Sequence, residues 1–228
     1  MHSFKKHRLL TGARAILLMA STAAPLSAAT VNWGTSFESG LATSTGAAMD
    51  SSFTFEIGFF ANSFIPTMEN VSEWEENWRT FDSATYSGND GWVTGTAEMN
   101  AEDGTSNGMG ADVGVNFSEM EAYVWVYNVT STGFQAEWFL GRHESWVFPS
   151  TLEDDCCDMR VEEWSLDDLG TGDTPVIGAH GEITGGGVTS QPGVYTIQTY
   201  AIPEPGSLWL MTLSLGACLR RRRVKSHN

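Results

Sequence analysis

Alternation between apolar and polar residues is the main pattern in the middle of the chain, and it predicts β-strands. Every second residue from Phe53 to Phe59 is Phe or Ile, with polar or small residues between them. Such a period of two is typical of a strand with one buried face. The segments 122–129 and 134–140 alternate in the same way on either side of a polar turn, which predicts a hairpin.

Further short alternating segments extend this pattern along the chain. Strands are predicted at 91–99, 145–148, 160–166, 181–184 and 194–201. Seven or eight short strands with Gly-rich turns predict an all-β fold, as one β-sandwich or jelly-roll-like domain. One short helix interrupts it at 72–79, because Ser72 and Glu75 have the spacing of a capping box. That helix would pack through Trp74 and Trp78.

The two ends of the chain carry apolar stretches that do not alternate. Met1 to Arg14 contains four basic residues and no acid, and a mostly apolar segment runs from Ala15 to Leu26. The small residues Ser27, Ala28 and Ala29 follow. This order is typical of a secretory signal peptide, so we expect an N-terminal signal helix over residues 1–29 and cleavage by signal peptidase after Ala29.

The C-terminal stretch has the opposite polarity. Pro203, Glu204 and Pro205 precede 14 apolar residues, 206–219, and the cluster Arg220, Arg221, Arg222 and Arg223 follows them. The prolines keep the segment apart from the body, and the arginines favour the cytoplasmic side of a membrane. As a helix, the apolar stretch spans about 21 Å, less than the ~30 Å hydrocarbon core of a bilayer. It therefore predicts a transient inner-membrane anchor whose arginines reach the headgroups.

These three parts, in this order, resemble the PEP-CTERM sorting signal of Gram-negative bacteria. The matching residues are Pro203, Glu204 and Pro205, the apolar helix, and the arginine cluster 220–223. The resemblance implies an exosortase-type membrane protease or transpeptidase as partner, with tail removal near the Pro-Glu-Pro segment. It also implies a final place at the cell surface or in the extracellular matrix, where exopolysaccharide is a candidate partner. It covers about a tenth of the chain and implies nothing about the chemistry of the body.

Without its two ends, the chain keeps the size of one domain, residues 30–202, between a signal peptide (1–29) and a sorting tail (203–228). Only Arg79, Arg142 and Arg160 oppose 27 acidic residues in this body, which gives it a net charge of −24. Such a surface excludes nucleic-acid binding, which depends on Lys and Arg. Eight tryptophans in the body indicate a folded chain, because disordered segments contain few aromatic residues.

One segment matches a catalytic pattern without its structural context. Gly104, Ser106 and Gly108 have the spacing of a nucleophile elbow, and Asp173 and His180 follow in the order of a hydrolase. An elbow needs a strand before it and a helix after it, whereas this one lies in 94–114, a Gly-, Asn- and Asp-rich segment that predicts a long, mobile connection. We therefore expect a non-enzymatic protein, with a secreted hydrolase as the second alternative.

An acidic segment with two adjacent cysteines offers a disulfide and a cation site. Cys156 and Cys157 have three open states: a vicinal disulfide in a turn, which we favour, bonds between molecules, or free thiols. The calcium candidates beside them are Asp154, Asp155 and Asp158, since Ca²⁺ takes carboxylate oxygens. No EF-hand loop is present, so a solvated acidic loop is the expectation, and we predict no other cofactor or metal.

An aromatic row in one predicted strand raises a carbohydrate-binding hypothesis. Tyr123, Trp125 and Tyr127 share one face of the strand 122–129, and flat aromatic rows can stack on sugar rings. The same row is typical of a sandwich core, which we favour because aromatic side chains dominate cores. The sequence thus predicts an exported, non-enzymatic surface or matrix protein, with a secreted carbohydrate-binding module as the first alternative.

Overall fold

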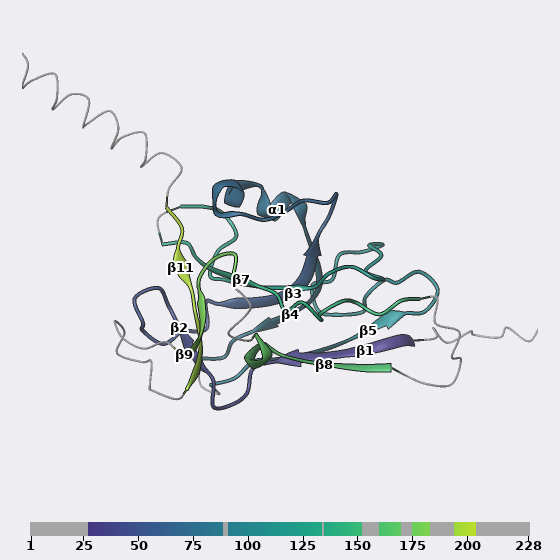
Figure 1. The fold of residues 1–228 in the computed structure, drawn as a ribbon, viewed down its shortest axis with the longest axis horizontal. Helices are drawn as coiled ribbons and strands as arrows, with labels where there is room; N and C mark the ends of the chain where they lie inside the picture. Colours follow the sequence, from purple (N-terminus) through teal and green to yellow (C-terminus); the bar gives the residue numbers. More distant parts are fainter. Residues whose placement is uncertain are drawn as a thin grey trace, which may run out of the picture.

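The computed structural model describes residues 27–88, 91–133, 135–151, 160–169, 175–182 and 194–203. Within these ranges the domain is all-β, as predicted, and short helical turns interrupt the strands (Figure 1). The strands are β1 (Ser27–Gly34), β2 (Gly40–Ala42), β3 (Thr54–Phe60), β4 (Trp78–Thr85), β5 (Thr94–Asn100), β6 (Tyr123–Tyr127), β7 (Glu137–Gly141), β8 (Arg160–Ser165), β9 (Ala179–Glu182), β10 (Tyr195–Gln198) and β11 (Tyr200–Ala201). The helical turns are η1 (Met68–Glu73), α1 (Trp74–Asn77) and η2 (Leu166–Asp168).

Three sheets make up the domain. The largest has five antiparallel strands in the order β11-β7-β6-β3-β4, and it contains the predicted hairpin as β6 and β7. The other two have three strands each, in the orders β5-β1-β8 and β2-β10-β9. In both of these, one neighbouring pair is parallel: β8 runs with β1, and β10 runs with β2. Each parallel pair brings together segments that are far apart in the chain.

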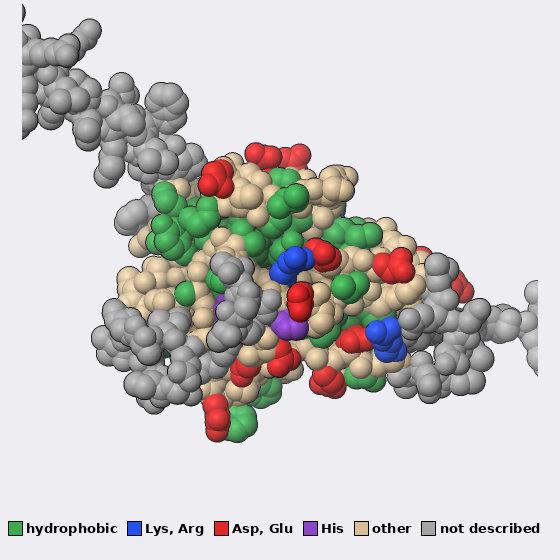
Figure 2. Space-filling view, in the orientation of Figure 1, with side chains coloured by type: hydrophobic (Ala, Val, Ile, Leu, Met, Phe, Trp, Pro, Cys, Tyr) green, Lys and Arg blue, Asp and Glu red, His purple; other side chains and the backbone are tan. Residues whose placement is uncertain are grey.

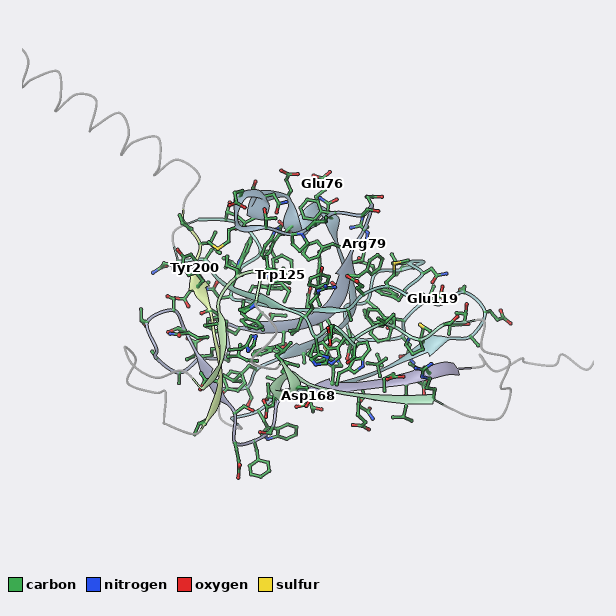
Figure 3. The ribbon with its side chains drawn as sticks, viewed as in Figure 1. Glu76, Arg79, Glu119, Trp125, Asp168 and Tyr200 are labelled. Carbon is green, nitrogen blue, oxygen red and sulfur yellow. The ribbon has the colours of Figure 1, made fainter. Side chains whose placement is uncertain are left out.

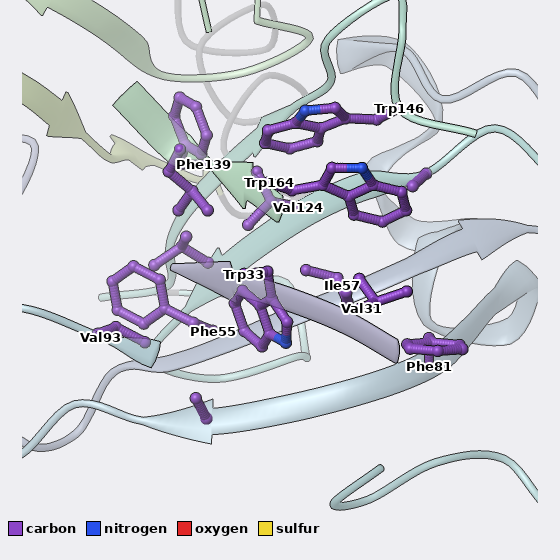
Figure 4. Close-up of a cluster of buried hydrophobic side chains, with 14 of the residues drawn as sticks. Val31, Trp33, Phe55, Ile57, Phe81, Val93, Val124, Phe139, Trp146 and Trp164 are labelled. Carbon is purple, nitrogen blue, oxygen red and sulfur yellow. The ribbon is translucent and has the colours of Figure 1, made fainter. Parts of the chain in front are cut away.

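The main hydrophobic core, which we call the inner core, fills the space between the five-stranded sheet and the two smaller sheets (Figure 4). Phe55, Ile57 and Phe59 of β3 point into it, which is the alternation that the sequence showed. All three sheets contribute to it: the five-stranded sheet also gives Phe81, Val124, Val126 and Phe139, and the smaller sheets give Val31, Trp33, Leu41, Ala97, Met99, Trp164 and Ile197. The result is a layered sandwich.

The opposite face of the five-stranded sheet is also buried. A second group, the outer cluster, consists of Phe60, Trp74, Trp78, Trp125, Ala136, Trp138, Leu140, Ile177 and Ile202. No strand covers this face in the described part of the chain; instead η1 and α1 lie over it (Figure 1). Burial on both faces explains why β6 carries large apolar side chains at successive positions, Val124, Trp125 and Val126.

The predicted helix is shorter than expected and begins differently. Helical turns run from Met68 to Asn77, and Trp78 already belongs to β4, where it pairs with Phe60. The capping contact is not between Ser72 and Glu75: Thr67 N–H donates to Asn70 Oδ1 (2.8 Å). Pairing with β3 provides Trp78 with a strand partner, and this tertiary contact overrides the helical spacing of the two tryptophans. Both indoles are nevertheless buried in the outer cluster.

One strand prediction and one loop prediction also need correction. The segment 145–148 forms only an isolated bridge, between Val147 and Glu121, and is not a strand. The segment 94–114 is not one long connection, because it opens with β5 and continues as a loop attached to β4. Thr80 N–H donates to Asp112 Oδ2 (2.9 Å), and Asp112 N–H donates to the Thr80 carbonyl oxygen (2.9 Å). The loop thereby covers part of the free edge of the sheet, which would otherwise expose unpaired backbone groups.

Candidate functional site

The described part of the body reaches the first residue of the sorting tail, Pro203. After β10, Thr199 N–H donates to the Ala42 carbonyl oxygen (3.0 Å), and β11 then joins the edge of the five-stranded sheet. Ile202 follows directly: its N–H donates to the Ala136 carbonyl oxygen (2.7 Å), and its side chain is 4% exposed. Pro203 is exposed and is the last residue described. The sorting residues Glu204, Pro205, Arg220, Arg221, Arg222 and Arg223 lie outside the described residues.

A half-buried carboxylate strengthens this junction from the side. Glu137 on β7 accepts hydrogen bonds from the backbone N–H and the hydroxyl of Ser44, both at 2.7 Å. It also accepts one from the hydroxyl of Thr199. A single side chain therefore links the loop after β2, strand β7 and the residue that precedes β11. Charge-assisted hydrogen bonds of this kind are stronger than those between neutral groups.

The aromatic row of β6 lies mostly inside the protein. Trp125 is 1% exposed and has the rings of Trp78 and Trp138 at centroid distances of 5.6 and 5.2 Å. Figure 3 places it within the body, below α1. Tyr123 and Tyr127 are half-buried at the border of the outer cluster. The row consequently presents no continuous aromatic face to solvent.

A hydrogen-bonded carboxylate lies next to Tyr127. Glu56 accepts from Tyr127 Oη (2.6 Å) on one oxygen, and from Trp78 Nε1 (2.8 Å) and Thr80 Oγ1 (3.0 Å) on the other. Burial raises the pKa of Tyr127 above its ordinary value, and the hydrogen bond to Glu56 raises it further. Burial also raises the pKa of Tyr123, while the positive charge of Arg142 opposes the shift. Both phenols therefore stay protonated at neutral pH, and the network holds β3, β4 and β6 together.

The described residues of the hydrolase pattern, Ser106 and His180, lie in separate parts of the fold. Ser106 Oγ donates to the Phe81 carbonyl oxygen (2.6 Å) and accepts from Gly108 N–H (2.9 Å). The first contact attaches the loop after β5 to β4, and the second lies within that loop. His180 lies on β9, in another sheet, with its ring 6.3 Å from that of Phe139. Asp173 lies outside the described residues.

Sequence analysis missed one buried carboxylate, Asp82 on β4. It is 2% exposed and accepts from Trp33 Nε1 (2.7 Å) and from Met109 N–H (2.8 Å). Glycines make room for it: a Cβ at Gly95 would lie 2.5 Å from Asp82 Oδ2, and one at Gly108 would lie 2.9 Å from Asp82 Oδ1. Asp82 thus joins β1 and β4 to the loop that follows β5. No local sequence pattern distinguishes it from the many acids on the surface.

The structure gives no direct view of the proposed cation and disulfide site. Asp154, Asp155, Cys156, Cys157 and Asp158 all lie outside the described residues. Within the described part, no group of three or more His, Cys, Asp or Glu side chains is arranged to hold a metal ion. None of the helices in that part is long and apolar enough to cross a membrane.

The few positive charges of the body are already engaged. Arg142 forms an ion pair with Glu121, and Arg160 Nε lies 2.5 Å from Glu162 Oε1. Arg79 donates to the backbone carbonyl oxygens of Glu76 (2.9 Å) and Trp78 (2.6 Å). Figure 2 accordingly shows scattered acidic side chains and few basic ones on the visible face. The negative charge of the body is therefore mostly uncompensated.

Comparison with known proteins finds one match, and it lies in the tail. Residues 201–223 match the family model of the PEP-CTERM protein-sorting motif. No curated protein and no solved structure matches the chain. The match confirms the resemblance seen in the sequence, and it begins at Ala201, inside β11. A signal of this kind marks an exported protein that an exosortase sorts at the membrane.

Proposed function

We propose that this chain is an exported, non-enzymatic surface or matrix protein, and that its PEP-CTERM tail delivers an acidic β-domain to the outside of the cell. The observation that carries the proposal is the motif match over 201–223, which starts in the last strand of the folded body. The sorting signal is therefore continuous with the domain that it delivers. Exosortase is the proposed processing partner, and the cell surface or the extracellular matrix is the proposed destination.

Export would begin with the N-terminal signal peptide, and the position of β1 in the fold limits when that peptide can be removed. Ala29, the proposed last residue of that peptide, is 1% exposed in β1 and pairs with Met99 and Arg160. Signal peptidase would have to cut before β1 takes its place between β5 and β8. After the cut, Thr30 to Gly34 keep their partners on both sides, so the mature chain retains most of this strand.

The charge of the body supports a role among cations and neutral polymers. A net charge of −24 repels anionic headgroups, so the body has no electrostatic reason to stay at the membrane once the tail is removed. Neutral exopolysaccharide and dissolved cations are the partners that such a surface admits. The hydroxyl proton of Ser106 is directed to a backbone carbonyl, which supports a structural rather than a catalytic role for that residue.

The test is to follow the full chain through cell fractions in a host that has the sorting enzyme. In the test variant, Arg220 to Arg223 are changed to Gln. We expect the wild type outside the cell without its tail, and the variant in the membrane fraction with its tail. The control variant changes Arg79, Arg142 and Arg160 to Gln, which removes positive charge from the body and should leave sorting unchanged. Equal export of the test variant and the wild type would overturn the proposal.

A further inference from the structure

The sorting motif and the folded body share two residues. The motif match begins at Ala201, which pairs with Glu137 of β7, and continues with Ile202, whose N–H is bonded to Ala136. The Ile202 side chain is buried in the outer cluster, and Tyr200 pairs with Trp138 in the ladder between β11 and β7. Figure 3 shows Tyr200 on this edge strand. The start of the motif is consequently held by backbone hydrogen bonds and by side-chain burial.

We propose that β11 and Ile202 form a clasp that fixes the upstream limit of the peptide bond that the sorting enzyme can cut. This inference rests on the proposed removal of the tail. A protease needs exposed backbone that can enter its active site, and packed backbone becomes available only when it opens locally. Ala201 and Ile202 have no such freedom while the domain is folded. The clasp therefore excludes the bonds up to and including Ile202–Pro203, and the bonds from Pro203–Glu204 onward are the ones left for the enzyme to cut.

The reaction itself is an ordinary acyl transfer. One peptide C–N bond breaks, and the acyl group of the body passes to water or to an amine acceptor. The released tail carries the new amino terminus and receives the acceptor's proton. In this reaction Ile202 is a positioning residue: it touches neither the broken bond nor the acceptor, but it determines which bond reaches the enzyme.

The short spacer makes the position of the clasp important. Only Pro203 to Pro205 separate Ile202 from the apolar segment that begins at Gly206. Four residue steps span at most about 14 Å. While the tail is inserted, the enzyme therefore meets the motif close to β11. Even a short clasp at β11 can therefore determine which peptide bond in this interval the enzyme cuts.

The clasp can be tested without the sorting enzyme, by hydrogen exchange on the full chain. In Ile202→Ala we expect amide exchange over residues 199–202 to rise about tenfold or more, because the buried side chain that holds the segment is lost. Ile177→Ala is the matched control: it makes the same truncation in the same outer cluster, where Ile177 is 2% exposed, but on another segment. Exchange over 199–202 should stay near the wild-type rate in this control. Equal acceleration in both variants, or no protection in the wild type, would overturn the clasp.

Processing gives the second readout. In the sorting host, every wild-type C-terminus outside the cell should lie at Pro203 or later. Ile202→Ala should add termini at or before residue 202, whereas Ile177→Ala should not. A wild-type terminus at or before Ile202 would overturn the proposal. If the tail is never removed, the proposed function fails, and the exchange measurement still decides whether the clasp exists.

Discussion

The two faces of the five-stranded sheet are buried by different means. Strands of two further sheets close the inner core, so backbone ladders satisfy most polar groups around it. The outer cluster is closed by η1 and α1, which offer no ladder, and three of its four tryptophans, Trp74, Trp78 and Trp138, make hydrogen bonds instead. Trp74 Nε1 donates to Asn70 Oδ1 (2.9 Å), and Trp138 Nε1 donates to the Val129 carbonyl oxygen (2.6 Å). A tryptophan ring can thus fill the space under these helical turns and also hold neighbouring residues in place through its N–H donor.

This difference also concerns the sorting tail. The tail leaves the body from the outer cluster, through Ile202, and not from the inner core. The face that is closed by a short irregular segment is therefore the one from which the motif emerges. Asp82, which accepts a hydrogen bond from Trp33 in the inner core, is buried, whereas Glu56, which accepts one from Trp78 in the outer cluster, is half-buried. Replacing each tryptophan by phenylalanine should therefore destabilise the two faces by different amounts.

The largest effect is expected in the inner core, for Trp33→Phe. Asp82 is 2% exposed, so loss of the indole donor leaves a buried carboxylate oxygen without its partner. Stability should fall by about 2–3 kcal/mol, measured by urea unfolding. Trp164→Phe is the control, since it truncates the same core while Asp82 keeps both donors. Equal losses in the two variants would contradict a special role for the bond to Asp82.

A smaller loss is expected in the outer cluster, for Trp78→Phe. Glu56 is half-buried and keeps Thr80 and Tyr127 as donors, so stability should fall by about 1 kcal/mol in the same urea experiment. Trp125→Phe is the matched control, because the Trp125 indole N–H has no hydrogen-bond partner within the described part of the chain. A larger loss in Trp125→Phe than in Trp78→Phe would show that ring packing, and not the hydrogen bond, holds this face.

The smallest effect is expected at alkaline pH. The pKa of Tyr127 is raised in the folded state, so its neutral form contributes stability that is present below about pH 10. That contribution is lost as the pH rises through the folded-state pKa. Tyr127→Phe should remove this part of the alkaline decline, as measured by unfolding between about pH 9 and pH 11. Identical pH profiles for wild type and variant would contradict the role of Tyr127.

Regular alternation of apolar and polar residues predicted β3, β6 and β7 correctly. The period of two from Phe53 to Phe59 identified β3, and the segments on either side of a polar turn identified the hairpin of β6 and β7. Strand β4 was missed because a register shift opposite Ile57 and Gly58 breaks its alternation, so that both Phe81 and Asp82 face the inner core. Strand β1 was missed because its first residues have the small side chains of a signal-peptide end.

The candidate site was predictable only in part, because some of its contacts join residues that are far apart in the chain. The tail is a local pattern, and local patterns can be recognised in one sequence. The clasp depends on the hydrogen bond from Ile202 to Ala136 and on the pairing of Tyr200 with Trp138, and these partners are more than 60 residues away in the chain. No spacing in the sequence encodes that contact. The same is true of Asp82, which resembles any surface acid until the fold places Trp33 beside it.

The most direct test of the account is the intact mass of the protein recovered outside the cell, after expression of the full chain in a host that has the sorting enzyme. The account predicts one C-terminus between Pro203 and the apolar segment, without the cluster Arg220 to Arg223. The body should then carry its full net charge of −24. An extracellular form that still contains those four arginines would contradict the central claim that the tail is a sorting signal removed during export.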